Sequence, residues 1–77
     1  MPRYYFDEFD GTRWAEDEIG TQCQDDDDAQ KNAYAALVDL ARDEIPQGGQ
    51  RIMRVRVRDG MGALFETSLT LDTVSQR

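Results

Sequence analysis

Hydrophobic and polar residues alternate most cleanly in the last third of the chain. In residues 51–58 the apolar positions alternate with arginines, namely Met53, Val55 and Val57 with Arg54, Arg56 and Arg58. In residues 63–71 the apolar positions Phe65, Leu69 and Leu71 alternate with Glu66, Ser68 and Thr70. Alternation with a period of two is typical of a strand that buries one face. The turn-like residues 59–62 lie between the two stretches, so we predict an antiparallel hairpin with one apolar and one arginine-rich face.

The first residues predict a second hairpin. Residues 3–9 are rich in aromatic side chains, and Asp10-Gly11 favours a two-residue type I′ turn. Residues 12–16 would form the return strand, with Glu8 opposite Arg13. In this register the aromatic side chains divide between two faces: Tyr4, Phe6 and Ala15 on one, and Tyr5, Phe9 and Trp14 on the other. Both faces are partly apolar, so the hairpin is either covered on both sides or presents one aromatic face to a partner.

A single helix is predicted over residues 26–45. Its apolar positions recur at helical spacing and are mostly alanines: Ala29, Ala33, Ala36, Leu37, Leu40, Ala41 and Ile45. Asp25 is the expected N-cap, with Asp28 three residues later in a variant of the capping box. Pro46 ends the predicted helix. Before the helix, residues 17–20 predict a turn containing Gly20, and residues 21–24 predict a short extended link.

The order of elements is β-β-α-β-β, which indicates an α+β domain. We expect an antiparallel sheet of about four strands over residues 1–71, with the helix packed on one face. The arginine stripe would lie on the other face, and residues 72–77 would form a loose tail.

The size of the chain favours self-association. The chain has 77 residues and one cysteine, so it is one domain without an intrachain disulfide. It has no histidine, which leaves a poor ligand set for zinc. A domain this small commonly gains stability from a partner subunit, and a homodimer is the expected state. We expect neither a signal peptide nor a membrane span, because the apolar runs are too short, and the lone cysteine fits the cytoplasm.

Acidic residues dominate the first part of the chain. The net charge is −7, and residues 1–28 hold ten acidic residues against two arginines. Residues 51–77 hold three acidic residues against five arginines. The two ends therefore differ in sign, which suits either a charged partner or mutual neutralisation within one fold.

The residues offer little for catalysis or for cofactor and metal binding. Cys23 has no histidine to activate it, and the neighbouring aspartates would raise its pKa. Carboxylate pairs such as Asp7 and Glu16 arise by chance in an acidic chain. The acidic run Asp25, Asp26, Asp27 and Asp28 does not match a calcium-binding loop and is typical of a helix start. We therefore expect no enzymatic activity, cofactor or metal.

Binding to another protein remains the favoured class of function. The candidate anchors are Tyr5, Phe9 and Trp14, with Arg54, Arg56 and Arg58 as charged contacts, because aromatics and arginine are enriched at interfaces. The aromatics could instead form a second small core under the tail. The arginine stripe could bind single-stranded nucleic acid, but the negative net charge would repel a polyanion, and pairing with Glu66 and other acids is the simpler interpretation.

Several short motifs occur in a specific order along residues 1–71. They are the opening Met-Pro-Arg-Tyr-Tyr-Phe, then Asp10-Gly11, Asp17 with Gly20, the alanine-rich helix, and Val57-Arg58-Asp59. Together they resemble a family of small uncharacterised alphaproteobacterial proteins, a domain of unknown function. The resemblance implies no activity, cofactor or catalytic residue. The chain departs from that family at Glu8, where an apolar residue is more usual.

A looser similarity of pattern links the chain to HicB-type antitoxins, which share an aromatic hairpin followed by an alanine-rich helix. It implies an alternative function, an acidic regulator that resembles an antitoxin or a nucleic-acid mimic. Such a regulator would use the run Asp25 to Asp28 to occupy the basic surface of a partner protein.

Overall fold

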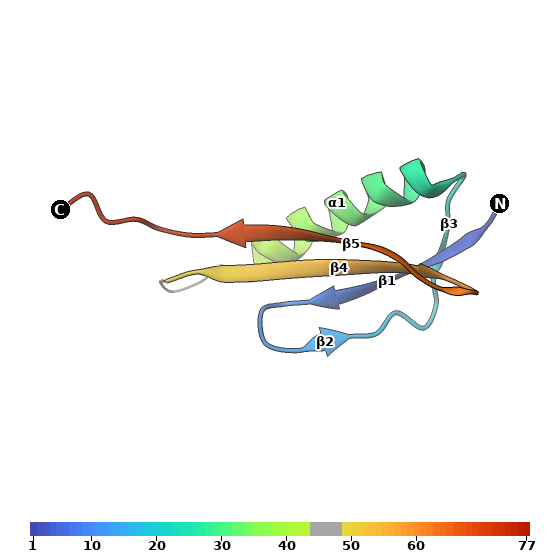
Figure 1. The fold of residues 1–77 in the computed structure, drawn as a ribbon, viewed down its shortest axis with the longest axis horizontal. Coiled ribbons are helices and arrows are strands. Elements are labelled where there is room, and N and C mark those ends of the chain that lie inside the picture. Colours follow the sequence, from blue (N-terminus) through green and yellow to red (C-terminus); the bar gives the residue numbers. More distant parts are fainter. Residues whose placement is uncertain (44–48) are drawn as a thin grey trace.

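The computed structural model describes residues 1–43 and 49–77. In these residues one helix packs on one face of an antiparallel five-stranded sheet, so the predicted α+β class is confirmed (Figure 1). The elements are β1 (Arg3–Phe9), β2 (Trp14–Ala15), β3 (Thr21–Gln22), α1 (Asp26–Asp43), β4 (Arg51–Asp59) and β5 (Gly62–Leu71). The predicted helix end at Ile45 and Pro46 lies outside the described residues.

The two hairpins join through their first strands. The strand order is β2-β1-β4-β5, and the short β3 pairs with the start of β1. The antiparallel pairing of β1 with β4 places Tyr5 opposite Arg58 and Phe9 opposite Arg54. Opposed residues share a face of the sheet. The aromatic face of the first hairpin and the arginine stripe of the second therefore form one continuous surface.

The register of the first hairpin differs from the prediction. Phe9 lies opposite Trp14, and Glu8 lies opposite Ala15 rather than Arg13. The Asp10 carboxylate accepts hydrogen bonds from the backbone N–H groups of Thr12 (2.7 Å) and Arg13 (3.0 Å), which winds the chain into a four-residue loop. Asp10 does not have the positive φ that a type I′ turn requires. The shift is two residues, so every side chain keeps its predicted face.

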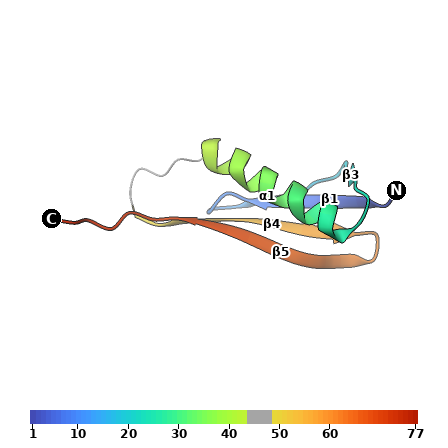
Figure 2. The ribbon, with the colours of Figure 1, turned by 90° about the horizontal axis from the view of Figure 1, so that it is seen from above.

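The core lies between α1 and the sheet. Its fully buried strand residues are Met53, Val55 and Val57, and the predicted inward face of β4 is confirmed. On the helix side Ala29 and Ala33 are completely buried, and these small residues let the helix approach β4 closely (Figure 2). The other face of the sheet has no helix over it in the described part of the chain. We call that surface the outer face.

Candidate functional site

The outer face is built from alternate residues of four strands. Its members are Tyr5, Asp7 and Phe9 from β1, Trp14 from β2, Arg54, Arg56 and Arg58 from β4, and Glu66 from β5. All six residues predicted as interface anchors therefore lie on one surface. The same surface also contains the acidic residues Asp7 and Glu66, which both lie opposite Arg56.

Trp14 is the most exposed aromatic residue of the outer face. Its side chain is 38% exposed, and its ring centroid lies 5.3 Å from that of Phe9. The guanidinium of Arg56 lies 4.2 Å from the centre of the Trp14 ring, in cation–π geometry. Arg58 lies in the same way over Tyr5, at 4.6 Å. The aromatic rings are thus held in fixed orientations by their neighbours.

Asp7 and Arg58 form the most buried ion pair of the outer face. Asp7 is only 5% exposed, and its two carboxylate oxygens accept bonds from Arg58 Nε (3.0 Å) and Nη2 (3.3 Å). Nη2 also donates to the backbone carbonyl of Asp17 at 2.7 Å, and Asp17 N–H donates to Asp7 at 2.9 Å. The bond to Asp7 raises the pKa of Arg58. This network ties the loop after β2 to the centre of the sheet.

Asp17 itself closes a gap at the edge of β1. Its carboxylate accepts the backbone N–H of Phe6 at 3.0 Å, in the stretch between the pairings with β2 and β3. It also accepts the N–H groups of Ile19 and Gly20, both at 3.0 Å. Burial opposes ionisation of Asp17, but the N–H donors of Gly20, Phe6 and Ile19, together with Arg58, outweigh it and lower the pKa of the carboxyl group. Asp17 therefore has a structural role.

Carboxylates neutralise the arginine stripe. Glu66 lies 3.4 Å from Arg54 and 3.5 Å from Arg56, while Glu16 and Asp7 both contact Arg58. The predicted pairing of these arginines with Glu66 and with acids of the first half is observed. A shallow hollow of about 370 Å³ lies among these side chains, lined by Asp7, Trp14, Glu16, Arg56 and Arg58. A phosphate group would have to displace internal carboxylates to bind here, which disfavours nucleic acid.

The acidic run lies on the helix side of the sheet, at the start of α1 and near the first residues of β1. Asp28 N–H donates to the Asp25 carboxylate, and Gln24 N–H donates to the Asp28 carboxylate, both at 2.9 Å. This is the predicted cap, with the return bond reaching one residue further back than in a standard capping box. Asp26 accepts the Tyr4 hydroxyl at 2.8 Å, which raises the pKa of Tyr4 to about 12. Three of the four aspartates thus have partners within the fold.

Asp25→Ala is expected to lower the free energy of unfolding by about 1 kcal/mol, because the N–H of Asp28 loses its acceptor. The control Asp27→Ala should cost about 0.3 kcal/mol, since Asp27 forms no hydrogen bond or ion pair with the described residues and contributes only its charge near the helix dipole. Urea denaturation followed by circular dichroism measures both. Equal losses would contradict the capping assignment.

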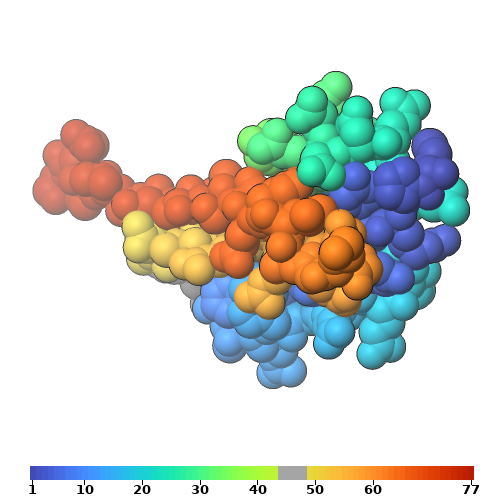
Figure 3. Space-filling model, turned by 45° about the vertical axis from the view of Figure 1, so that its right-hand side comes forward, coloured from blue at the N-terminus to red at the C-terminus, as the bar shows by residue number. Residues whose placement is uncertain are grey.

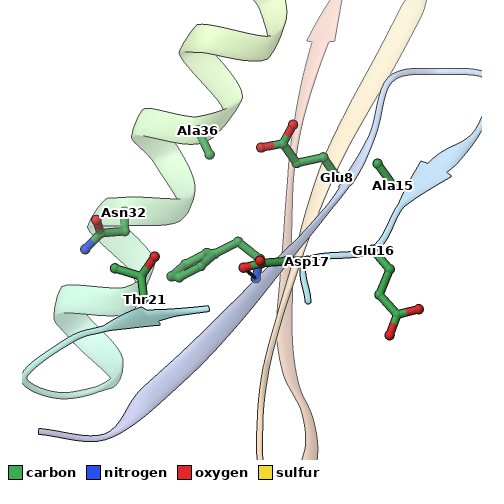
Figure 4. A pocket seen from close by; sticks show the side chains of 8 residues that line it. Glu8, Ala15, Glu16, Asp17, Thr21, Asn32 and Ala36 are labelled. Carbon is green, nitrogen blue, oxygen red and sulfur yellow. Dashed lines mark hydrogen bonds between the residues drawn. The ribbon is translucent and has the colours of Figure 1, made fainter. Parts of the chain in front are cut away.

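A groove lies on the helix side of the sheet, where α1 leaves β1 and β2 uncovered (Figure 4). Its volume is about 410 Å³. Asn32 and Ala36 form its helix wall, and Glu8 and Ala15 form part of its strand wall. Glu8 points into the groove toward α1, whereas Glu16 points away. Burial, helped by the Asp17 and Asp39 carboxylates, raises the pKa of Glu8.

Glu8→Gln is expected to raise the free energy of unfolding at neutral pH. The raised pKa means that the folded protein binds the Glu8 proton more tightly than the unfolded chain does. Ionised Glu8 therefore opposes folding above its folded pKa, and the penalty vanishes below the ordinary glutamate pKa of 4.5. Urea titrations at about pH 7 and about pH 4 should show a gain only at the higher pH. An equal gain at both would contradict this account.

The remaining candidates are the Cys23 thiol, a metal site and a membrane span. Cys23 is completely buried, and that burial, with Asp28 nearby, raises the pKa of its thiol. Across residues 1–43 and 49–77, no three potential ligand side chains group in a way that could hold a metal ion. Within the part of the chain that the structure describes, no helix is long and apolar enough to cross a membrane.

Sequence reasoning missed the central role of Asp7 and Asp17. In the sequence Asp7 and Glu16 resemble a chance carboxylate pair, yet both bind Arg58 in the structure. One signal was available for Asp7: in a strand of alternating faces it lies between Tyr5 and Phe9, on the same face. An acidic side chain between two aromatic ones on a strand face indicates that a basic side chain or a hydrogen-bond donor is paired with it.

Comparison with known proteins gives a family without an assigned activity. No curated protein and no solved structure matches the chain. Residues 3–70 match the family described as domain of unknown function DUF6894. That range includes all six strand and helix elements except the last residue of β5. The chain therefore belongs to the DUF6894 family.

Proposed function

We propose that this chain is a small, non-catalytic protein-interaction module that binds a protein partner through the outer face of its sheet and also self-associates. The observation that supports this most is Trp14, which lies open on that face between Phe9 and Arg56. Tryptophan, tyrosine and arginine are the residue types that most often dominate interface energies.

The geometry of the outer face suits binding for a second reason. Its long side chains already hold fixed positions through the stacks and ion pairs described above. Binding of a partner would therefore cost little further entropy of these side chains, because they are already ordered. Because carboxylates neutralise the arginines, the expected partner offers a mixed apolar and polar surface rather than a polyanion. The lone, buried Cys23 is compatible with a reducing compartment, and we place the module in the cytoplasm.

Affinity capture tests this proposal. Tagged wild type, Trp14→Ala and the control Thr12→Ala would be incubated with an extract of the native host at low salt, and the eluates analysed for protein and nucleic acid. We expect one stoichiometric protein partner with wild type and Thr12→Ala, and its loss from Trp14→Ala. Thermal melts establish that all three are folded. A partner retained by Trp14→Ala, or nucleic acid alone, would contradict the proposal.

An acidic regulator that resembles an antitoxin or a nucleic-acid mimic is the second candidate. It is favoured by Asp27, which is exposed and has no hydrogen bond or ion pair within the described residues. In that case the captured partner would be a basic protein, and its binding would fall steeply with salt. Asp27→Asn would release it, whereas Trp14→Ala would not.

A further inference from the structure

The free edge of β5 is the longest unpaired strand edge that the structure describes. β5 has ten residues, and within the described chain only β4 pairs with it. Natural edge strands are commonly protected by proline, by lysine, by bulges or by shortness. β5 has neither proline nor lysine, and the irregularity in its pairing is confined to its start, opposite Val57 and Arg58. The regular part, residues 65–71, lacks these protections.

The only charge in β5 does not protect the edge either. Glu66 is held across the outer face by Arg54 (3.4 Å) and Arg56 (3.5 Å), both from the strand on the other side. Its carboxylate is therefore directed toward β4. A second strand that approached the free edge would not meet an unpaired charge.

An exposed apolar side of α1, formed by Tyr34 and Val38, lies beside this edge. Asn32 and Ala36 line the groove over β1 and β2, so that side of α1 faces away from β5. At about 100° per residue, Tyr34 and Val38 lie on the opposite side. Both are half exposed, at 51% and 53%. Because α1 packs on β4 and β5, this flank lies on the β5 side of the molecule, where Figure 3 shows the orange-red strand directly beneath the green helix.

We propose that a second copy of this chain binds here, with its β5 paired antiparallel to this β5 across a two-fold axis at Ser68. The sheet would continue through both copies, and the two helices would lie on the same side of it. Their Tyr34 and Val38 flanks would face each other across the axis. Such an interface is isologous, so each contact occurs twice.

The residue pattern of β5 favours a second copy as the occupant. In this register Phe65 lies opposite Leu71 of the second copy, and Thr67 lies opposite Leu69, so the apolar, helix-side row continues across the axis. Glu66 lies opposite a threonine, so like charges do not meet. The pattern of apolar and polar residues in β5 is therefore compatible with antiparallel pairing to a second β5. The chain is short, its single cysteine forms no intrachain disulfide, and residues 1–43 and 49–77 offer no metal site, so the pairing would add stability.

This inference rests on the self-association included in the proposed function, but it uses a surface separate from the outer-face aromatics. Seven paired residues span roughly 24 Å, which is a small interface. We therefore expect dissociation in the micromolar range, measurable by sedimentation velocity over a concentration series.

Ser68→Glu is the variant that tests the pairing. It places two carboxylates opposite each other on the axis, which should weaken the dimer by roughly tenfold or more. Within one chain residue 68 lies opposite Arg54, so the new carboxylate gains a favourable neighbour and the fold should survive. The control Thr12→Glu adds the same charge in the exposed β1–β2 loop. Ser68→Cys, treated with a short bis-maleimide, should cross-link to its copy, whereas Thr12→Cys should not; the native Cys23 is completely buried.

Each outcome decides the proposal. A wild-type dimer that Ser68→Glu dissociates and Thr12→Glu does not, together with the Ser68→Cys cross-link, supports it. A monomer at every concentration overturns it. A dimer that persists in Ser68→Glu but dissociates in Trp14→Ala also overturns it, while leaving the outer face as the proposed binding surface. Pairing of the β5 edge only with a different protein overturns it as well.

Discussion

Asp7→Ala is expected to lower the free energy of unfolding by about 3 kcal/mol. Asp7 is 5% exposed and accepts bonds from Arg58 and from the backbone N–H of Asp17. Its removal leaves a partly buried guanidinium without its main counter-ion and a loop N–H without an acceptor. A domain of this length has only about 4–12 kcal/mol of stability, so the loss is large. The midpoint of thermal unfolding should fall by about 12–24 °C.

Glu16→Ala provides the matched control, because Glu16 also contacts Arg58 but its side chain is 72% exposed. Exposed ion pairs contribute little, so we expect a change within about 0.5 kcal/mol. Chemical denaturation of the three proteins measures the difference. Equal losses in the two variants would show that the Asp7 pair does not anchor the loop to the sheet.

The second large effect is expected in the core. Met53 is completely buried in β4 beneath α1, and it is the largest of the fully buried side chains among the described residues. Met53→Ala removes three heavy atoms and leaves a cavity, which should cost about 3 kcal/mol. Met53→Leu keeps most of the volume and should cost less than about 1.5 kcal/mol.

Met61→Ala controls for the change of residue type, since Met61 lies in the β4–β5 turn and is 98% exposed. We expect its free energy of unfolding to stay within about 0.5 kcal/mol of the wild type. Urea midpoints at a fixed protein concentration allow direct comparison. A Met53→Ala loss no greater than that of Met61→Ala would contradict the assignment of the core.

The fold was largely predictable because its strongest signals are local. The alternation in residues 51–58 and 63–71 predicts an inner and an outer face for each strand. The inner residues of β4 are buried, and those of the edge strand β5 are half-buried. The alanine-rich stripe likewise predicts which side of α1 meets the sheet. The strand order was not predictable, since no local pattern in β1 specifies β4 as its neighbour.

The first hairpin shows where local signals fail. The dipeptide Asp10-Gly11 favours a two-residue turn, but the Asp10 side chain captures two backbone N–H groups and widens the loop. The extended link contains β3, whose pairing with Tyr4 and Arg3 depends on the position of the Asp17 loop. Both outcomes follow from side-chain to backbone hydrogen bonds, which propensity does not capture.

The candidate site was predicted as a set of residues but not as a network. Alternation placed Tyr5, Phe9 and Trp14 on one face, and the structure places the arginines beside them. The stacking of Arg56 on Trp14 requires the pairings of both β2 and β4 with β1, so it depends on the full topology. The raised pKa of Glu8 also depends on a tertiary feature, the groove beside α1.

The sheet has a helix on one face, while the other presents aromatic and arginine side chains held in place by carboxylates. The Asp7 pair and Asp17 fix the loop after β2, and thereby the strand that carries Trp14. We propose that a partner protein covers this face in the cell.

Hydroxyl-radical footprinting measures directly whether this face is covered. The tagged protein would be labelled once in buffer and once in an extract of its host, then digested and analysed by mass spectrometry. Trp14, the only tryptophan, reports on the outer face, and Met61, in the exposed turn, is the internal reference. We predict that labelling of Trp14 falls in the extract while that of Met61 does not. Trp14 labelled equally in both would contradict the account.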